Sequence, residues 1–139
     1  MSTGRSAYGD TSGTRSREAR PLMERVMAFS LRDEIEALRS EEQWQDGDRN
    51  SRTLAKDVDF RVLLTVLHDG ATLDEQDGDA RVSIQLLEGE VQLAVNGQST
   101  DLGAGGLAVV DAGQSWDVRA RGDCAVLLTF AWPRDKAGV

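Results

Sequence analysis

From about residue 52 onward, hydrophobic and polar positions alternate along the chain with a period of two. This alternation is typical of strands that bury one face and expose the other. The alternating runs are short, rich in β-branched residues and separated by Gly, Asp or Asn, which is the spacing of a β sandwich or barrel. The pattern predicts an all-β domain built from RTLAK, DFRVLLTVLH, ATLDE, RVSIQLL, EVQLAV, QSTDL, GLAVVD, SWDVRA and CAVLLTFAW.

The junction between EVQLAV and QSTDL carries a hairpin signal. Asn96 and Gly97 separate the two runs, and a two-residue turn of type I′ needs positive φ at both central positions, which Asn and Gly tolerate best. We therefore expect a tight hairpin here. Alternation then places Val91, Leu93 and Val95 on the inward face.

Residues 28–50 precede the predicted barrel and show helical spacing instead. Ser30 is a suitable N-cap, and the helix is expected to run to about Gln43 with one apolar face formed by Leu31, Ile35 and Leu38. This amphipathic helix and the nearby Trp44 are expected to cover one end of the domain. The segment QDGDRNSR that follows is interpreted as a loop.

Both ends of the chain are expected to lie outside the folded barrel. Residues 1–27 are rich in Ser, Thr, Gly and Arg and hold few large apolar side chains, so we expect a disordered arm. One hypothesis is that the native chain begins at Met23 or Met27. The predicted barrel spans residues 51–133, and residues 134–139 are expected to form a C-terminal tail.

The net charge of the chain disfavours nucleic acid as a partner of the barrel. The chain of 139 residues has a formal charge of −8 at pH 7. Because the arm holds more basic than acidic side chains, the barrel is more acidic than the whole, and it should repel nucleic acid. A regulator with a basic N-terminal arm stays open as an alternative. It predicts salt-sensitive nucleic-acid binding that is lost when residues 1–26 are removed.

The single cysteine and the apolar runs bear on the compartment. One cysteine, Cys124, forms no intramolecular disulfide, which fits a reducing compartment. No apolar run approaches the roughly 20 residues that cross a bilayer, and the N-terminus lacks the apolar centre of a signal peptide. We therefore expect a cytoplasmic protein without a membrane partner.

The order of strands and glycines over roughly residues 52–132 resembles the cupin superfamily, whose RmlC-like members are jelly-roll barrels of the double-stranded β-helix type. Cupins carry a first motif, G-x5-H-x-H-x3,4-E-x6-G, and a second, G-x5-P-x-G-x2-H-x3-N. The first motif falls on Gly70, Gln76, Gly78, Val82 and Gly89. The second falls on Gly105, Asp111, Gly113, Trp116 and Ala120. The motif glycines are kept, whereas all four ligand positions of the family's metal site are replaced.

The replaced positions bear on cofactors. Val82 and Gly78 offer no donor atom, Trp116 offers only an N–H, and Gln76 is at best a weak oxygen ligand. We therefore expect no cofactor: no iron, manganese, zinc or copper at the family's site, and no dioxygenase or metal-dependent isomerase chemistry. An acidic turn that begins at Asp74 fails as a calcium loop because its twelfth position is Gln rather than Glu.

If the motif alignment holds, the former ligand volume is apolar. Strand alternation points Val82, Ile84 and Leu86 inward, opposite Trp116 and Val118 on the facing strand. Gln76 is expected near the mouth of the barrel, and Gly78 belongs to the same degenerate site. This interior either packs solid or leaves a small pocket for an apolar or aromatic ligand.

His68, the only histidine, is the remaining candidate for acid–base chemistry. With Asp69 or Glu75 it could serve a metal-independent isomerase or epimerase of the cupin type. Such enzymes also need an inward-facing acid such as tyrosine, and Tyr8 lies in the arm. An exposed histidine at the rim of the barrel is the simpler interpretation, and Cys124 is expected to be a buried thiol with no imidazole beside it.

Together these features predict a metal-free, cupin-like barrel preceded by an amphipathic helix and a disordered arm. Its expected role is that of a small-ligand-binding or interaction module without catalysis. The alternatives are the His68 isomerase or epimerase and the regulator with a basic arm. The resemblance also implies a homodimer, formed by sheet packing or by exchange of an N-terminal element such as RTLAKDVDF.

Overall fold

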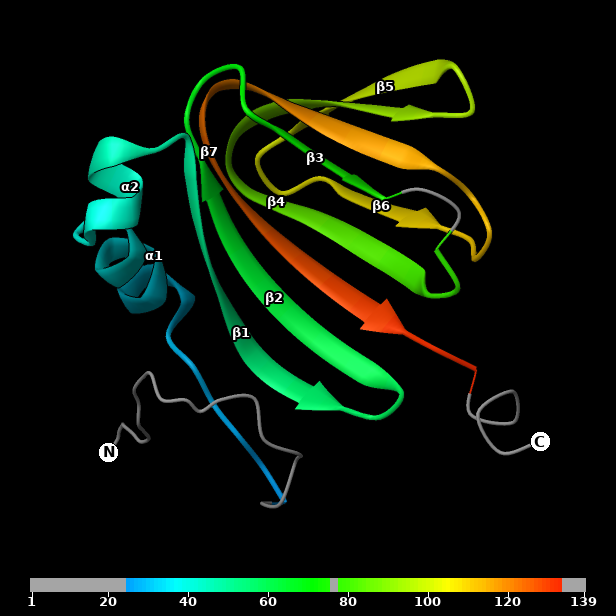
Figure 1. Cartoon of the computed structure of the whole chain (residues 1–139), viewed down its shortest axis with the longest axis horizontal. Helices are drawn as coiled ribbons and strands as arrows, with labels where there is room; N and C mark the ends of the chain where they lie inside the picture. Colours follow the sequence, from blue (N-terminus) through cyan, green and yellow to red (C-terminus); the bar gives the residue numbers. More distant parts are fainter. Residues whose placement is uncertain (1–24, 76–77, 134–139) are drawn as a thin grey trace.

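The structure is a computed structural model and describes residues 25–75 and 78–133. Within these residues two short helices precede the strands, and Figure 1 shows both helices on one outer side of a curved stack of strands. The elements are α1 (Leu31–Arg39), α2 (Glu42–Asp46), β1 (Arg49–Asp57), β2 (Phe60–Leu67), β3 (Thr72–Glu75), β4 (Arg81–Val95), β5 (Gln98–Gly103), β6 (Leu107–Val110) and β7 (Trp116–Ala131).

The strands form two layers because the long strands β4 and β7 each run through both. The first half of β4 pairs with the second half of β7, and their other halves pair with each other in the opposite layer. One layer has the order β1-β2-β7-β4-β6, and the other has the order β3-β7-β4-β5. Every pairing is antiparallel. The predicted all-β jelly-roll barrel is confirmed.

Two of the predicted strand boundaries are wrong. RVSIQLL and EVQLAV form one strand, β4, and SWDVRA and CAVLLTFAW form one strand, β7. Gly89 inside β4 has φ of 88°, and Gly122 inside β7 has φ of 83°. The pairing of β4 with β7 also shifts register around Glu88. A left-handed glycine with a neighbouring bulge bends a strand without ending it, so each long strand turns from one layer into the other.

The hairpin prediction at the β4–β5 junction is confirmed. Asn96 and Gly97 have φ of 52° and 82°, as a type I′ turn requires. Val95 pairs with Gln98 across the turn. Val91 is buried, as are Leu93 and the other inward residues of this layer, whereas Val95 at the turn is half-buried.

The helical region differs from its prediction in length. Ser30 caps α1 as expected, since its hydroxyl accepts a hydrogen bond from the Asp33 N–H at 3.3 Å. The helix ends at Arg39 rather than near Gln43, and Ser40 forms its C-cap: the Ser40 N–H donates to the Glu36 carbonyl at 3.1 Å and its hydroxyl to the Ala37 carbonyl at 2.8 Å. A second helix, α2, then holds Trp44, and the strand β1 begins inside the segment predicted to be a loop.

Polar contacts tie the helices to β1. The Asn50 side chain, 8% exposed, donates to the Leu38 carbonyl and to the Glu41 carboxylate, both at 2.9 Å. Arg52 pairs with Glu34 at 2.8 Å and with Glu41 at 2.7 Å. Because these partly buried ion pairs link both helices to one strand, the helices lie in a fixed position against the outer face of the barrel.

Alternation along β2 separates two groups of buried side chains. Leu64 and Val66 face the helices and pack with Leu38, Trp44 and neighbours. Leu67 faces the barrel interior and packs with residues of β4 and β7. The interior cluster comprises Leu67, Ala71, Val82, Ile84, Leu86, Val91, Leu93, Val110, Trp116, Val118, Ala120, Cys124, Val126, Leu128 and Phe130.

Thr65 alternates with Leu64 and Val66 and therefore points into the interior. It is fully buried, and its hydroxyl oxygen forms no hydrogen bond with any described residue. A buried hydroxyl without a partner costs about 1–3 kcal/mol, whereas an apolar group of the same shape does not. Thr65→Val is expected to raise the free energy of unfolding by about 1 kcal/mol, measured by urea denaturation.

The matched control for Thr65→Val is Thr53→Val, since Thr53 is exposed on the neighbouring strand β1. That change should shift the free energy of unfolding by less than about 0.5 kcal/mol. Equal or lower stability for Thr65→Val would show that the hydroxyl has a partner, such as an enclosed water.

Several expectations concern segments outside the described residues. The disordered arm falls almost entirely within residues 1–24, and the C-terminal tail falls within residues 134–139, neither of which is described. Within residues 25–75 and 78–133, no helix is both long and apolar enough to span a membrane. The homodimer stays a prediction.

Candidate functional site

The residues predicted to line the former ligand volume meet in the barrel interior. Val82 and Ile84 on β4 and Trp116 and Val118 on β7 belong to one cluster of buried side chains, with exposures of 5% or less. Gln76 lies outside the described residues. Gly78 is described, and its carbonyl accepts a hydrogen bond from the Gly113 N–H at 2.7 Å.

The motif glycines all serve backbone geometry. Gly70 and Gly89 of the first motif and Gly105 and Gly113 of the second have φ between 82° and 89°, a region that side chains with a Cβ atom disfavour. The Gly78–Gly113 hydrogen bond joins the loops of the two motifs. These glycines thus maintain the turns of the barrel whether or not a metal is bound.

The side chains at the former ligand positions do not fit a transition metal. Valine and glycine have no donor atom, and the indole of Trp116 presents an N–H rather than a lone pair. Within residues 25–75 and 78–133, no group of three or more His, Cys, Asp and Glu side chains is placed to hold a metal ion. The interior at these positions is filled by hydrocarbon and indole surface.

The position of the second-motif proline is occupied by Asp111, which has a structural role. Its carboxylate accepts a hydrogen bond from the Ala112 N–H at 2.8 Å and pairs with Arg81 at 3.0 Å. The Ala112 hydrogen bond, followed by Arg81, lowers the pKa of the Asp111 carboxyl. A hydrogen bond from a nearby backbone N–H to an Asp side chain restricts the backbone conformation locally. It does so at the position where the family's motif has a proline.

His68 faces the helices rather than the barrel interior. Its ring stacks on Trp44 with centroids 3.4 Å apart and planes 14° apart. Nε2 lies 2.9 Å from the Trp44 carbonyl oxygen, and Nδ1 lies 3.5 Å from the Asp123 carboxylate. The Asp69 carboxylate accepts a hydrogen bond from the Gly122 N–H at 2.7 Å. These contacts join α2 to the barrel and give His68 a structural role.

Cys124 is a buried thiol, as predicted. Its Sγ donates to the Glu90 carbonyl oxygen at 3.0 Å, and burial raises the pKa of the Cys124 thiol. A raised thiol pKa lowers the fraction of thiolate, which is the nucleophilic form. The residue therefore serves packing beneath Gly89 rather than chemistry.

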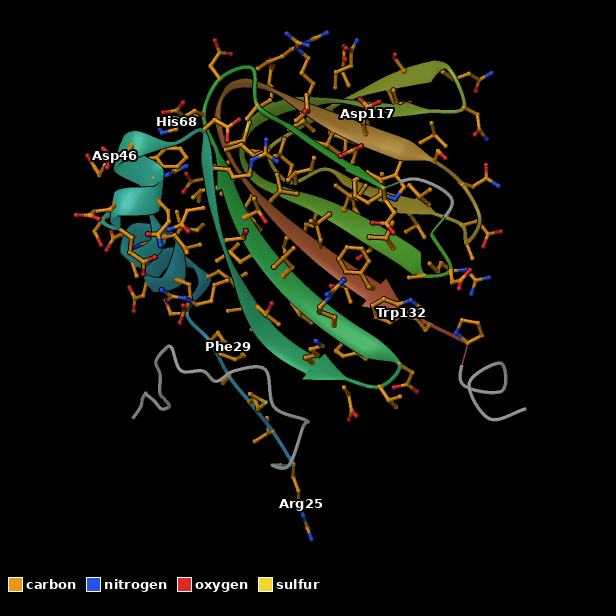
Figure 2. The ribbon with its side chains drawn as sticks, viewed as in Figure 1. Arg25, Phe29, Asp46, His68, Asp117 and Trp132 are labelled. Atoms are coloured by element: carbon orange, nitrogen blue, oxygen red, sulfur yellow. The ribbon has the colours of Figure 1, made fainter. Side chains whose placement is uncertain are left out.

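A pocket of about 400 Å³ opens at the end of the barrel that lies away from His68. We call it the mouth pocket, and its lining residues are Lys56, Asp57, Val58, Arg61, Asp79, Trp132 and Pro133. They come from the β1–β2 hairpin, from the end of β7 and from the residue after Gly78. Figure 2 shows Trp132 at the end of β7 and His68 beside the helices, at opposite ends of the molecule. The pocket therefore borders the loop of the first motif.

Arg61 lies over aromatic rings in this pocket. Its guanidinium carbon is 5.0 Å from the centroid of the Phe130 ring and 5.5 Å from that of Trp132. Phe130 and Trp132 are themselves stacked, with centroids 5.9 Å apart and planes 20° apart. Arg61 pairs with Phe130 across β2 and β7, so the sheet register brings the cation and the rings together.

The charged groups of the mouth pocket differ in their hydrogen bonds and ion pairs. The Asp57 carboxylate accepts a hydrogen bond from the Val58 N–H at 2.7 Å within the hairpin turn. No ion pair joins Arg61 to a carboxylate among the described residues, and its Nε atom is buried without a hydrogen-bond partner. The pocket thus combines an aromatic surface with a cation that has no counter-ion in the described part of the chain.

Sequence reasoning did not identify this pocket. Arg61 lies at an inward position of β2, in alternation with Leu63, Thr65 and Leu67. An arginine at an inward position was the one feature of the sequence that indicated a pocket here. Its aromatic neighbours lie some seventy positions later in the chain. Only the pairing of β2 with β7 brings them together, and that pairing could not be deduced from a single sequence.

No protein-family model matches the sequence, and a comparison with curated proteins finds no match. Solved structures do match the fold. A conserved protein of unknown function from Streptococcus pyogenes is 16% identical with a TM-score of 0.62, over 85% of this chain and 97% of that one. A cupin superfamily protein from Desulfitobacterium hafniense is 20% identical with a TM-score of 0.58, over 61% and 78%.

A third similar structure is the cupin domain of an XRE family transcriptional regulator from Enterobacter cloacae. It is 14% identical with a TM-score of 0.57, over 63% of this chain and 99% of that one. At these identities the likeness concerns the fold of the barrel and not its activity.

Proposed function

Because the chain has the cupin fold, a small jelly-roll barrel whose mouth is a common place for ligands, we propose that it is a metal-free module that binds a small molecule without catalysis. The ligand binds in the mouth pocket. The observation that carries this proposal is the pairing of a filled interior at the former ligand positions with an open pocket beside them.

The size and surface of the mouth pocket support binding. Ligand pockets commonly enclose about 300–1,000 Å³, and this pocket has about 400 Å³. Trp132 and Pro133 give it an apolar wall, and Lys56 and Arg61 provide polar groups that orient a ligand. A mostly apolar surface with a few polar groups is the usual composition of such sites.

The two alternatives receive less support. The isomerase or epimerase needs His68 at the ligand, but His68 stacks on Trp44 at the other end of the barrel. The regulator with a basic arm depends on residues 1–24, which are not described. One similar structure is the cupin domain of a transcriptional regulator, and at 14% identity this likeness supports the fold but not nucleic-acid binding by this chain.

The proposal predicts a ligand adduct that depends on Trp132. Native mass spectrometry of protein purified from its own host is expected to show a co-purified small molecule and no stoichiometric metal. Trp132→Ala should lose the adduct because it removes the apolar wall of the pocket, whereas Trp132→Phe should retain much of it. The subunit number from the same spectra tests the predicted homodimer.

Two results would contradict the proposed function. One is stoichiometric metal that disappears in Gln76→Ala protein, because it would place a metal at the former ligand positions. The other is protein from the native host that carries no adduct, or an adduct unchanged by Trp132→Ala.

A further inference from the structure

We infer that the mouth pocket takes a small organic monoanion, a carboxylate attached to a flat apolar group, with Arg61 binding the carboxylate and Trp132 contacting the flat group. This inference rests on the proposed function, since it names the chemical class of the ligand for the same pocket. It follows from three observations: Arg61 has no carboxylate partner among the described residues, aromatic rings surround it, and the pocket lining carries charges of both signs.

Arg61 is half-buried, and no carboxylate of the described residues pairs with it, whereas Arg119, which also has no such partner, is exposed to solvent. Arg39 pairs with Glu88 at 2.8 Å, and Arg81 pairs with Asp111 at 3.0 Å. In a chain with 24 acidic and 16 basic side chains, carboxylates are the more abundant group. Arg61 lines the pocket and pairs with none of the described carboxylates, so its terminal N–H donors, unlike the buried Nε, are the groups that a ligand can meet.

The aromatic rings hold the guanidinium in place. The guanidinium carbon lies over both the Phe130 and the Trp132 ring, and contact with two rings limits its motion. A guanidinium presents parallel N–H donors that match the two oxygens of a carboxylate. Phe130 is 6% exposed and belongs to the interior cluster. The core thereby positions the arginine, and less freedom is lost when a ligand binds.

The remaining lining residues restrict the charge of the ligand. Lys56 adds a second cation, but Asp57 and Asp79 add two carboxylates. A ligand with several negative charges would meet these carboxylates as well as the acidic surface of the barrel, which repels polyanions at longer range. A single carboxylate needs only Arg61, and an apolar body matches the wall formed by Trp132 and Pro133.

Benzoate and its neutral counterpart benzamide are suitable probes for the full-length protein. The chain has three tryptophans, so a proton–nitrogen correlation spectrum contains three indole signals, assigned by single Trp→Phe variants. We expect benzoate to shift the Trp132 signal with millimolar affinity and to leave Trp44 and Trp116 unchanged. Benzamide should bind at least about tenfold more weakly, because a hydrogen bond to a charged group is worth roughly 1.5–3 kcal/mol.

Two arginine variants test the role of Arg61. Arg61→Gln is expected to weaken benzoate binding at least about tenfold while leaving benzamide binding nearly unchanged. Arg119→Gln is the control, since Arg119 is exposed on β7 and its loss changes the net charge equally. Unchanged Trp44 and Trp116 signals in the variants show that the barrel is folded.

The outcomes separate this inference from the proposed function. Equal affinity for benzoate and benzamide, or equal benzoate affinity of Arg61→Gln and the parent protein, overturns the monoanion inference, although a ligand at Trp132 still supports the function. No shift of the Trp132 signal at tens of millimolar benzoate also overturns it. The proposed function fails separately, if protein from the native host carries no adduct that depends on Trp132.

Discussion

Replacing Trp116 by Ala is expected to lower the free energy of unfolding by about 3–5 kcal/mol, the range for loss of a buried large aromatic side chain. The indole occupies the fourth ligand position of the family's metal site, is 5% exposed and packs in the interior cluster. Its removal both exposes apolar neighbours and leaves a cavity between β4 and β7. Urea denaturation followed by circular dichroism measures the change.

Trp132→Ala is the control, because it removes a tryptophan that lies outside the barrel interior. Trp132 is half-buried at the mouth pocket and packs against the edge of the same cluster, so its loss should cost less than about 2 kcal/mol. A cost below about 1 kcal/mol for Trp116→Ala would mean that the indole closes an open cavity. The interior would then itself be a candidate ligand site, and the mouth pocket would lose its support.

The fold was largely predictable because its signals are local. Alternation along residues 81–95 requires only neighbouring positions, and the Asn96-Gly97 turn requires only two. The bends at Gly89 and Gly122 were not recognised, because a glycine inside an alternating pattern is compatible with either a bend or a break. At the end of α1, hydrogen bonds from the Ser40 N–H and hydroxyl satisfy the last carbonyl groups, and the apolar pattern does not contain these contacts.

The candidate site was less predictable because it depends on long-range register. The apolar character of Val82 and Trp116 is visible in the sequence, and both side chains lie in the buried interior cluster. Arg61 and Phe130 become neighbours only through the pairing of β2 with β7. Contacts of this kind are set by the tertiary fold, so a single sequence shows which residue types occupy the family's ligand positions but not which side chains meet at the mouth pocket.

The glycines and the former ligand positions obey different physical constraints. A glycine with φ near +88° resists replacement regardless of function, since a Cβ atom in this region costs about 1–2 kcal/mol. A histidine or glutamate is needed only while a metal is bound. Once the metal is not required, apolar side chains stabilise the fold by about 1.5–3 kcal/mol each when fully buried. Gly89 and Val82 illustrate the two cases within one motif.

Gly89→Ala is the second substitution with a large expected effect, a loss of about 2–5 kcal/mol in the free energy of unfolding, which combines backbone strain with overpacking. Gly89 has φ of 88°, and a Cβ atom there would lie 2.5 Å from the Asp123 carbonyl oxygen and 2.9 Å from the Cys124 Sγ. A backbone oxygen within a paired strand cannot move aside as the end of a flexible side chain can. The cost is measured by urea denaturation.

Gly105→Ala is the matched control, because Gly105 has φ of 89° and a Cβ atom there would meet nothing within 4 Å. Gly105→Ala should therefore lose only the free energy that backbone strain costs, about 1–2 kcal/mol. The difference in unfolding free energy between the two variants then measures the cost of the close approach of β4 to β7. Equal losses in both variants would show that β4 and β7 separate at little cost at Gly89. The bend at Gly89 would then be flexible enough to accept a side chain.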